Sequence, residues 1–213
     1  MLLRDGLLRR LWWFKGRRGL SEHSTRIFMA GPAFPPAMAK RFNPRDHGVS
    51  FPRAVKIEYR PFTAYFRGFD RVEAVRRTFG SKTAQILQSV EVEFFSSQWG
   101  YMGVSDQDGH LLVSAHYLRH GKPRDIYLDV IHELVHVKQF REGRKLFPEG
   151  FEYSTAPTEI EAYNVCIAEG RRLGMKDREV LEYLRVPWMD DKELRRLARN
   201  VGLKVPRRGA KRR

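Results

Sequence analysis

The segment His132-Glu133-Leu134-Val135-His136 holds the residue types of a hydrolytic metal site. Histidines four residues apart project from the same face of a helix, so both imidazoles can bind one tetrahedral zinc ion. Glu133 lies about 100° further around the helix than His132, where its carboxylate can reach a water on the metal rather than the metal itself. The spacing therefore predicts His132 and His136 as Zn²⁺ ligands and Glu133 as the general base.

A catalytic zinc ion needs a third protein ligand and an open position for water, and that ligand should come from an element packed beside the first helix. The segment Thr158–Tyr163 begins a second predicted helix, in which Glu159 stands 23 residues after His136. This separation leaves room for a loop that returns the chain antiparallel. Glu159 and Glu161 are both candidates for the third ligand.

These features resemble the gluzincin metallopeptidases, particularly the minimal ones, in which a hairpin, a His-Glu-x-x-His helix and a glutamate-bearing helix make up most of the fold. The resemblance covers about residues 85–172. It implies that Glu159 is the third ligand, because it stands three residues before Ala162, a small residue that allows close helix packing; Glu161 is the competitor. It also implies zinc-dependent hydrolysis of a bond in a peptide or protein substrate.

The chain departs from the family pattern at one position. Where the family commonly has an Asp or Asn that hydrogen-bonds a zinc-bound histidine, this chain has Tyr163, and Asn164 is a potential substitute. The strand around Leu112–Ala115 resembles the edge strand along which such enzymes align the substrate backbone. Developing oxyanion charge needs a further donor, and the unranked candidates are Tyr153, Tyr163, His116 and His120.

Periodicity in the sequence predicts the elements that position these residues. An Asp-Gly turn at Asp108-Gly109 predicts a hairpin just before the histidines, and capping signals place Asp70 and Thr158 at helix starts. The predicted strands are 90–94, 101–104 and 110–118, and the predicted helices are 70–79, 126–140, 158–173, 177–185 and 190–201. Together they predict an α+β fold: a small zincin-like domain with a hairpin or sheet packed on the His-Glu-x-x-His helix, a glutamate-bearing helix, and C-terminal helices.

The formal net charge of +15 is unevenly distributed along the 213 residues. Residues 1–90 hold 18 Lys and Arg against 6 Asp and Glu, whereas residues 91–170 hold 7 against 13, and residues 171–213 hold 15 against 6. Excess carboxylates in the middle segment suit cation binding. The basic ends leave one alternative open: a nucleic-acid-binding or scaffold protein with a structural or degenerate metal site, which contacts nucleic acid through its tails.

Proline and charge patterns predict four regions. They are a basic, Pro-rich N-terminal arm over 1–54, a zincin-like metallopeptidase domain over 55–176, a C-terminal helical pair over 177–203 and a basic tail over 204–213. The amphipathic start, residues 1–20, fits a membrane-surface helix, a helix docked on the domain, or an over-long gene start with the true beginning at Met29 or Met38. Charges interrupt its apolar stretches, so no transmembrane segment is expected.

The single cysteine, Cys166, excludes an intramolecular disulfide framework and a Cys-rich zinc knuckle. We expect Cys166 to be a buried small residue rather than a ligand or a redox switch. This cysteine usage fits a reducing compartment, and we predict a cytoplasmic location.

Overall fold

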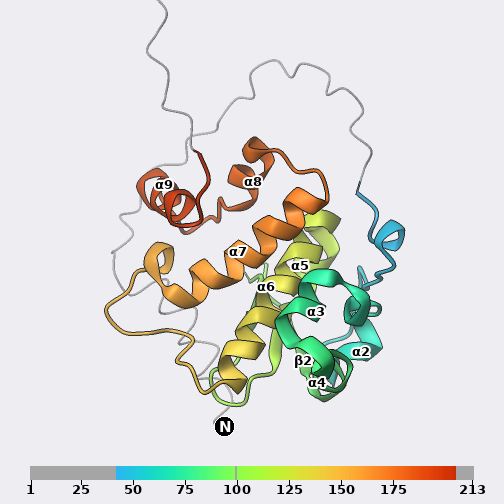
Figure 1. Ribbon diagram of the computed structural model, residues 1–213. Helices are drawn as coiled ribbons and strands as arrows, with labels where there is room; N and C mark the ends of the chain where they lie inside the picture. Colours follow the sequence, from blue (N-terminus) through green and yellow to red (C-terminus); the bar gives the residue numbers. More distant parts are fainter. Residues whose placement is uncertain (1–41, 99, 205–213) are drawn as a thin grey trace, which may run out of the picture.

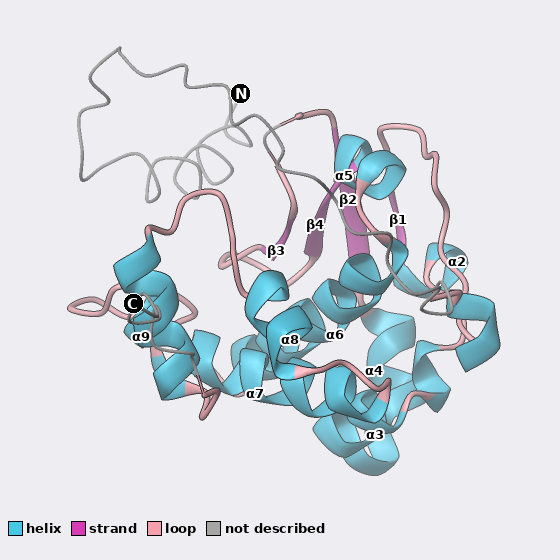
Figure 2. Cartoon of the chain, turned by 90° about the horizontal axis from the view of Figure 1, so that it is seen from above, coloured by secondary structure: helices cyan, strands magenta, loops and turns pink. Residues whose placement is uncertain are grey.

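The computed structural model describes residues 42–98 and 100–204. Within them, four strands form one mixed sheet in the order β1-β2-β4-β3, with β1 antiparallel to β2, β2 parallel to β4, and β3 antiparallel to β4. Figure 2 shows this order across the sheet. The strand bounds are β1 Tyr59–Pro61, β2 Glu91–Phe95, β3 Met102–Val104 and β4 Leu111–Ser114.

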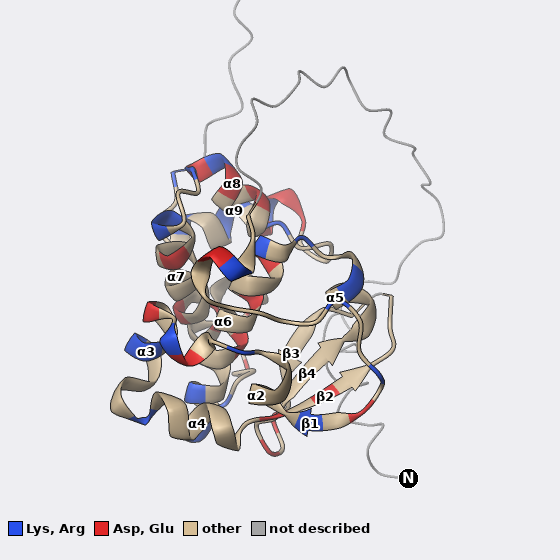
Figure 3. Ribbon diagram, turned by 90° about the vertical axis from the view of Figure 1, so that its right-hand side faces the viewer, with Lys and Arg blue, Asp and Glu red and all other residues tan. Residues whose placement is uncertain are grey.

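Helices are stacked beside this sheet, as Figures 1 and 3 show for α3, α6 and α7. The fold is therefore α+β, as the sequence predicts. The helix bounds are α2 Phe62–Tyr65, α3 Glu73–Phe79, α4 Thr83–Ser89, α5 Ala115–His120, α6 Pro123–Arg141, α7 Pro157–Arg172, α8 Asp177–Tyr183 and α9 Asp191–Asn200. Short 3₁₀ turns are η1 Pro44–His47, η2 Phe69–Arg71, η3 Gly80–Lys82 and η4 Tyr153–Thr155.

The predicted hairpin is present as β3 and β4. Its turn is closed by the backbone N–H of Ser105, which donates to the carbonyl of His110 at 2.9 Å. Gly109 has φ +78°, a conformation that favours glycine, and a Cβ added there would clash with the ring of Phe140 at the end of α6. The hairpin turn therefore packs directly on the helix that carries the histidines.

The strand predicted over 110–118 is too long. The sheet ends at Ser114, whose hydroxyl accepts a hydrogen bond from the backbone N–H of Tyr117 and so caps helix α5. A side-chain oxygen at this position satisfies one of the unpaired N–H groups of a helix start, which favours helix over continued strand. His116 and His120 consequently lie on a helix and not on a strand.

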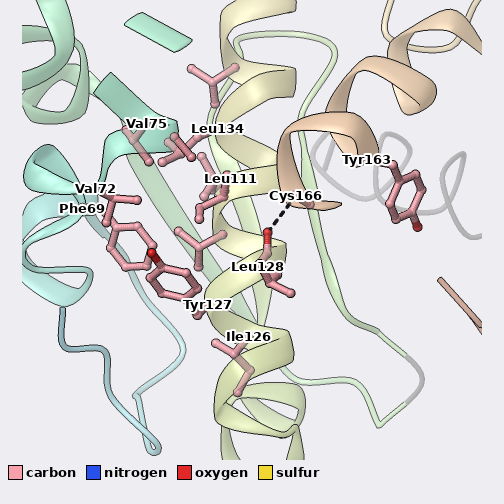
Figure 4. Close-up of a cluster of buried hydrophobic side chains, with 14 of the residues drawn as sticks. Phe69, Val72, Val75, Leu111, Ile126, Tyr127, Leu128, Leu134, Tyr163 and Cys166 are labelled. Carbon is pink, nitrogen blue, oxygen red and sulfur yellow. Dashed lines mark hydrogen bonds between the residues drawn. The ribbon is translucent and has the colours of Figure 1, made fainter. Parts of the chain in front are cut away.

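Helix α6 is confirmed and begins slightly earlier than predicted, with Pro123 in its first turn. Most of the helix is buried, because the sheet lies on one side of it and α3 and α7 on others. Figure 4 shows its apolar side chains packed against those of the α3 region, and Tyr163 of α7 pointing away from that region. Labelled members of the core are Phe69, Val72, Val75, Leu111, Ile126, Tyr127, Leu128, Leu134, Tyr163 and Cys166.

Two capping predictions are wrong. Helix α3 begins at Glu73, after the 3₁₀ turn η2, and its N-terminal cap is Val72 rather than Asp70. Thr158 lies inside α7, behind Pro157, and its hydroxyl donates to the carbonyl of Leu146 at 3.0 Å. A proline at the first helical position needs no donor partner, so this helix starts without a side-chain cap.

The C-terminal helices contact the rest of the domain. Asp190 caps α9 as predicted, with Glu193 at the reciprocal position. Arg196 of α9 forms an ion pair with Glu152, and Asn200 donates to the carbonyl of Ser154 at 2.8 Å. Helix α9 is thereby attached to the segment just before α7.

Part of the predicted N-terminal arm packs on the core. Val49 is buried, and the ring of Phe42 lies 5.5 Å from that of Tyr127. The predictions for residues 1–41 and 205–213, including Met29, Met38 and the end of the basic tail, lie outside the described residues. Among the residues described, no helix is both long and apolar enough to cross a membrane.

Candidate metal centre

Three side chains from α6 and α7 meet at one point. The Nε2 atoms of His132 and His136 are 3.0 Å apart, and Glu159 places Oε2 at 3.2 Å from His132 Nε2 and Oε1 at 3.6 Å from His136 Nε2. All three residues are buried, with exposed fractions of 6%, 3% and 6%. One ligand atom from each lies within 4.8 Å of the others, so this group could hold a metal ion.

The antiparallel packing of α6 and α7 produces this arrangement. His132 and His136 are one turn apart on the same face of α6. Ala162, one turn after Glu159, is fully buried, as expected for a small residue at a close helix contact. Cys166 is buried, and its thiol donates to the carbonyl of Leu128 (Figure 4), which confirms it as a small buried residue between the helices.

Gln139 fixes the orientation of His136. Its amide nitrogen donates to the carbonyl of Thr158 and to Oε2 of Glu161, each at 3.0 Å, which leaves its Oε1 to accept from Nδ1 of His136 at 2.8 Å. Nδ1 therefore carries the proton, and the Nε2 lone pair points to the meeting point of the three side chains. Gln139 was not among the residues predicted from the sequence, although its spacing of three from His136 was the available signal.

Glu161 lies outside the three-residue group. It accepts hydrogen bonds from Gln139, Lys138 and Arg144. Burial acts to raise its pKa, but these partners, Arg144 first, lower the pKa to about 2. Glu159, not Glu161, therefore accompanies the two histidines.

Electrostatics within the group are those of an ion pair. Burial acts to lower the pKa of His136, but the carboxylate of Glu159 reverses this and raises it. The same contact lowers the pKa of Glu159, in spite of its burial. A cationic charge among these atoms is thus stabilised by the carboxylate.

Glu133 and the group border one pocket of about 230 Å³. The exposed fraction of Glu133 is 7%, and its Oε2 has no hydrogen-bond partner among the described residues. An unpaired buried carboxylate oxygen is costly unless something absent from the chain itself, such as water or substrate, satisfies it. Other side chains lining the pocket include Phe95, Tyr101, Met102, Phe147, Val186 and Trp188.

Two of the four oxyanion candidates line this pocket. The hydroxyls of Tyr153 and Tyr163 are 2.7 Å apart, and the Tyr163 ring lies edge-on to His132 with centroids 4.5 Å apart. Burial raises the pKa of both tyrosines well above the usual value. His116 and His120 are exposed on α5 and do not line the pocket.

Two further expectations need correction. Asn164 is exposed and borders a different cavity, between α3, α6 and α7, so it does not take the place of the family's Asp or Asn beside a histidine. The strand β4, which includes Leu112, is interior, and the edge strand at the pocket is β3 with Met102 and Gly103. The order of the strands along the chain does not predict which strand is at the edge. Because β2 pairs with β4 in parallel, β3 lies at the edge of the sheet.

Asp129 is a pocket residue that was not predicted from the sequence. It stands three residues before His132 on α6 and accepts hydrogen bonds from the hydroxyls of Tyr117 and Tyr183, the latter at 2.9 Å. Burial raises the pKa of Asp129 to about 6, although the two tyrosines act to lower it. The spacing of three from a histidine on a predicted helix was the signal available in the sequence.

No protein-family model matches the chain, and the searches of curated proteins and of solved structures give no match either. The fold and the site define the chain as an α+β protein with a buried His-His-Glu group able to hold a metal ion.

Proposed function

We propose that this chain is a zinc-dependent peptidase of gluzincin type, with His132, His136 and Glu159 as the metal ligands and Glu133 as the general base. One observation carries the proposal: two imidazole Nε2 atoms and a carboxylate converge within 4.8 Å, beside the unpartnered oxygen of Glu133 in the same pocket. A peptide or protein substrate and a cytoplasmic location belong to the same proposal.

The donor set fits zinc. Two histidines and one glutamate leave a fourth tetrahedral position open, which is the ligand pattern of hydrolytic zinc sites. Gln139 holds His136 in the tautomer that a metal ligand needs, because its Oε1 accepts from Nδ1. Zinc in this place would supply Lewis acidity, which lowers the pKa of water and polarises a carbonyl group.

The residues around the group have defined roles in this proposal. Glu133 takes the proton from the attacking water and passes it to the leaving amine. The hydroxyls of Tyr153 and Tyr163 stay protonated because burial raises their pKa. One of them donates to the other, and the proton of the second donates a hydrogen bond to the developing oxyanion. The edge strand β3, whose Met102 and Gly103 border the pocket, offers backbone groups to an extended peptide, which is strand addition.

Counting bound metal tests the ligand set. We expect about one zinc ion per full-length chain in the wild type, its loss in His136→Ala and Glu159→Ala, and its retention in Glu161→Ala. Glu161→Ala is the matched control, because the residue is two positions away on α7 and bonds Lys138, Arg144 and Gln139 rather than the histidines; Gln139 keeps its bond to the carbonyl of Thr158 in this variant. No zinc in the wild type would refute the site and favour the alternative of a nucleic-acid-binding protein.

Hydrolysis tests the role of Glu133. Glu133→Gln removes the proton acceptor but keeps the size of the side chain, so we expect normal zinc content with cleavage of a peptide library lowered by about 10²-fold or more. Cleavage by Glu133→Gln at the wild-type rate would refute the assignment. Salt-sensitive nucleic-acid binding that this substitution leaves unaltered would support the alternative function.

A further inference from the structure

Asp129 lies in the candidate active-site pocket but has no part in the proposed hydrolysis. It stands one helical turn before Glu133 on α6, so its Cα is about 6 Å from that of Glu133 along the helix axis. Both side chains border the same pocket. A carboxylate is therefore fixed about one turn from the reacting centre.

Two tyrosines hold Asp129 in place. Tyr183 of α8 donates to Oδ1 at 2.9 Å, and Tyr117 of α5 donates to Oδ2. Neither tyrosine lines the pocket. A carboxylate has about four acceptor positions, and these bonds use two of them. The remaining acceptor capacity is available to a group in the pocket.

Asp129 has no ion-pair partner among the described residues, and the nearby base that acts to lower its pKa is His132, three residues further along α6. None of the pocket residues is Lys or Arg. The two positive charges of a zinc ion would be matched by Glu133 and Glu159. Asp129 would then be the carboxylate in the pocket without a counter-charge, in surroundings where an unpaired charge is unfavourable.

Aromatic rings line the same pocket. Tyr101 lies 4.9 Å from Tyr117 and 5.5 Å from Trp188, and Trp188 lies 6.1 Å from Tyr153, measured between ring centroids. Aromatic faces attract cations, and they do so most strongly where water is excluded. A carboxylate beside several aromatic rings is a suitable site for an ammonium or guanidinium group.

We propose that Asp129 and the neighbouring rings of Tyr101 and Trp188 form a subsite for a positively charged group of the substrate. The group is a Lys or Arg side chain, or the free α-amino group of a peptide; each presents N–H donors that carry a positive charge. This inference rests on the proposed peptidase function and names its substrate class. Asp129 is then a specificity-determining residue.

Binding of four hydroxamates to the zinc-loaded full-length protein, measured by calorimetry, tests the inference. The probes are the hydroxamates of lysine and norleucine and their Nα-acetyl derivatives, which share the metal-binding group and nearly the same carbon chain. If the Nα-acetyl-lysine hydroxamate binds more tightly than the Nα-acetyl-norleucine hydroxamate, by about tenfold or more, the subsite binds a side-chain cation. Tighter binding of free than of acetylated norleucine supports an α-amino group.

The variant Asp129→Asn should reduce either ratio to near one, whereas Asp125→Asn, one turn earlier on α6 and outside the pocket, should leave it unchanged. Equal binding of all four probes by the wild type overturns the subsite but leaves the metal site intact. Absence of zinc uptake together with no binding of any probe overturns the metal site and the subsite with it. The wild-type comparison decides the inference even if Asp129→Asn fails to fold.

Discussion

Replacing Gln139 with methionine should weaken zinc binding without removing a ligand. Gln139 is fully buried and makes three hydrogen bonds, to His136 at 2.8 Å and to Thr158 and Glu161 at 3.0 Å each. Methionine has a similar length but cannot accept the Nδ1 proton of His136, so the imidazole loses its fixed tautomer and orientation. Loss of such a partner typically lowers metal affinity by about 10–100-fold, which is about 1.4–2.7 kcal/mol.

Competition with a chelator of known zinc affinity measures this effect, and Gln88→Met on the exposed surface of α4 is the matched control. The substitution should also lower the free energy of unfolding of the metal-free protein, because the carbonyl of Thr158 loses a buried donor, at a cost of about 1–3 kcal/mol. A folded Gln139→Met protein with the zinc affinity of the wild type would refute the argument that this amide orients His136.

Two further predictions concern stability. Zinc at 100 times its Kd should raise the free energy of unfolding by about 2.7 kcal/mol. Thermal unfolding measures this gain, which a chelator should reverse and which the variant His136→Ala should lack. Glu169→Gln should destabilise by about 2 kcal/mol at pH 7 in urea unfolding, because a buried carboxylate loses its charge-assisted bonds to Arg172 and Tyr127. Those bonds lower the pKa of Glu169 in the folded protein despite its burial. The difference in free energy of unfolding between wild type and Glu169→Gln should therefore persist above the pKa that Glu169 has in the unfolded chain, and shrink as the pH falls below it. A difference that stays constant down to pH 3 would contradict this.

Much of the site could be predicted from the sequence because its residues lie on long, periodic helices. The four-residue spacing of His132 and His136 places both imidazoles on one face only if the segment is a helix, and the apolar stripe of α6 indicated that it is. The choice between Glu159 and Glu161 came from a resemblance, since both start the same helix. Only the packing of α7 on α6 separates them, by directing Glu161 to Arg144 and Glu159 to the histidines.

Other features depended on contacts between distant segments, which leave little trace in a local pattern. Residues 110–118 have the composition of a strand, but Ser114, in the middle of this segment, caps the start of helix α5. Asp129 acquires its position in the pocket from Tyr117 and Tyr183, which lie 12 residues before and 54 residues after it. Pairing of β2 with β4 likewise decides which strand is at the edge.

The contact between Gly109 and Phe140 has a consequence for how the protein tolerates change. A side chain at position 109 would push the hairpin away from the end of α6 and so move the edge strand relative to the histidines. In a library of single substitutions, position 109 should therefore be as intolerant as the residues of the candidate metal centre, although it contributes no atom to that centre. Sequence variation would thus be restricted at a turn that lies outside the candidate site.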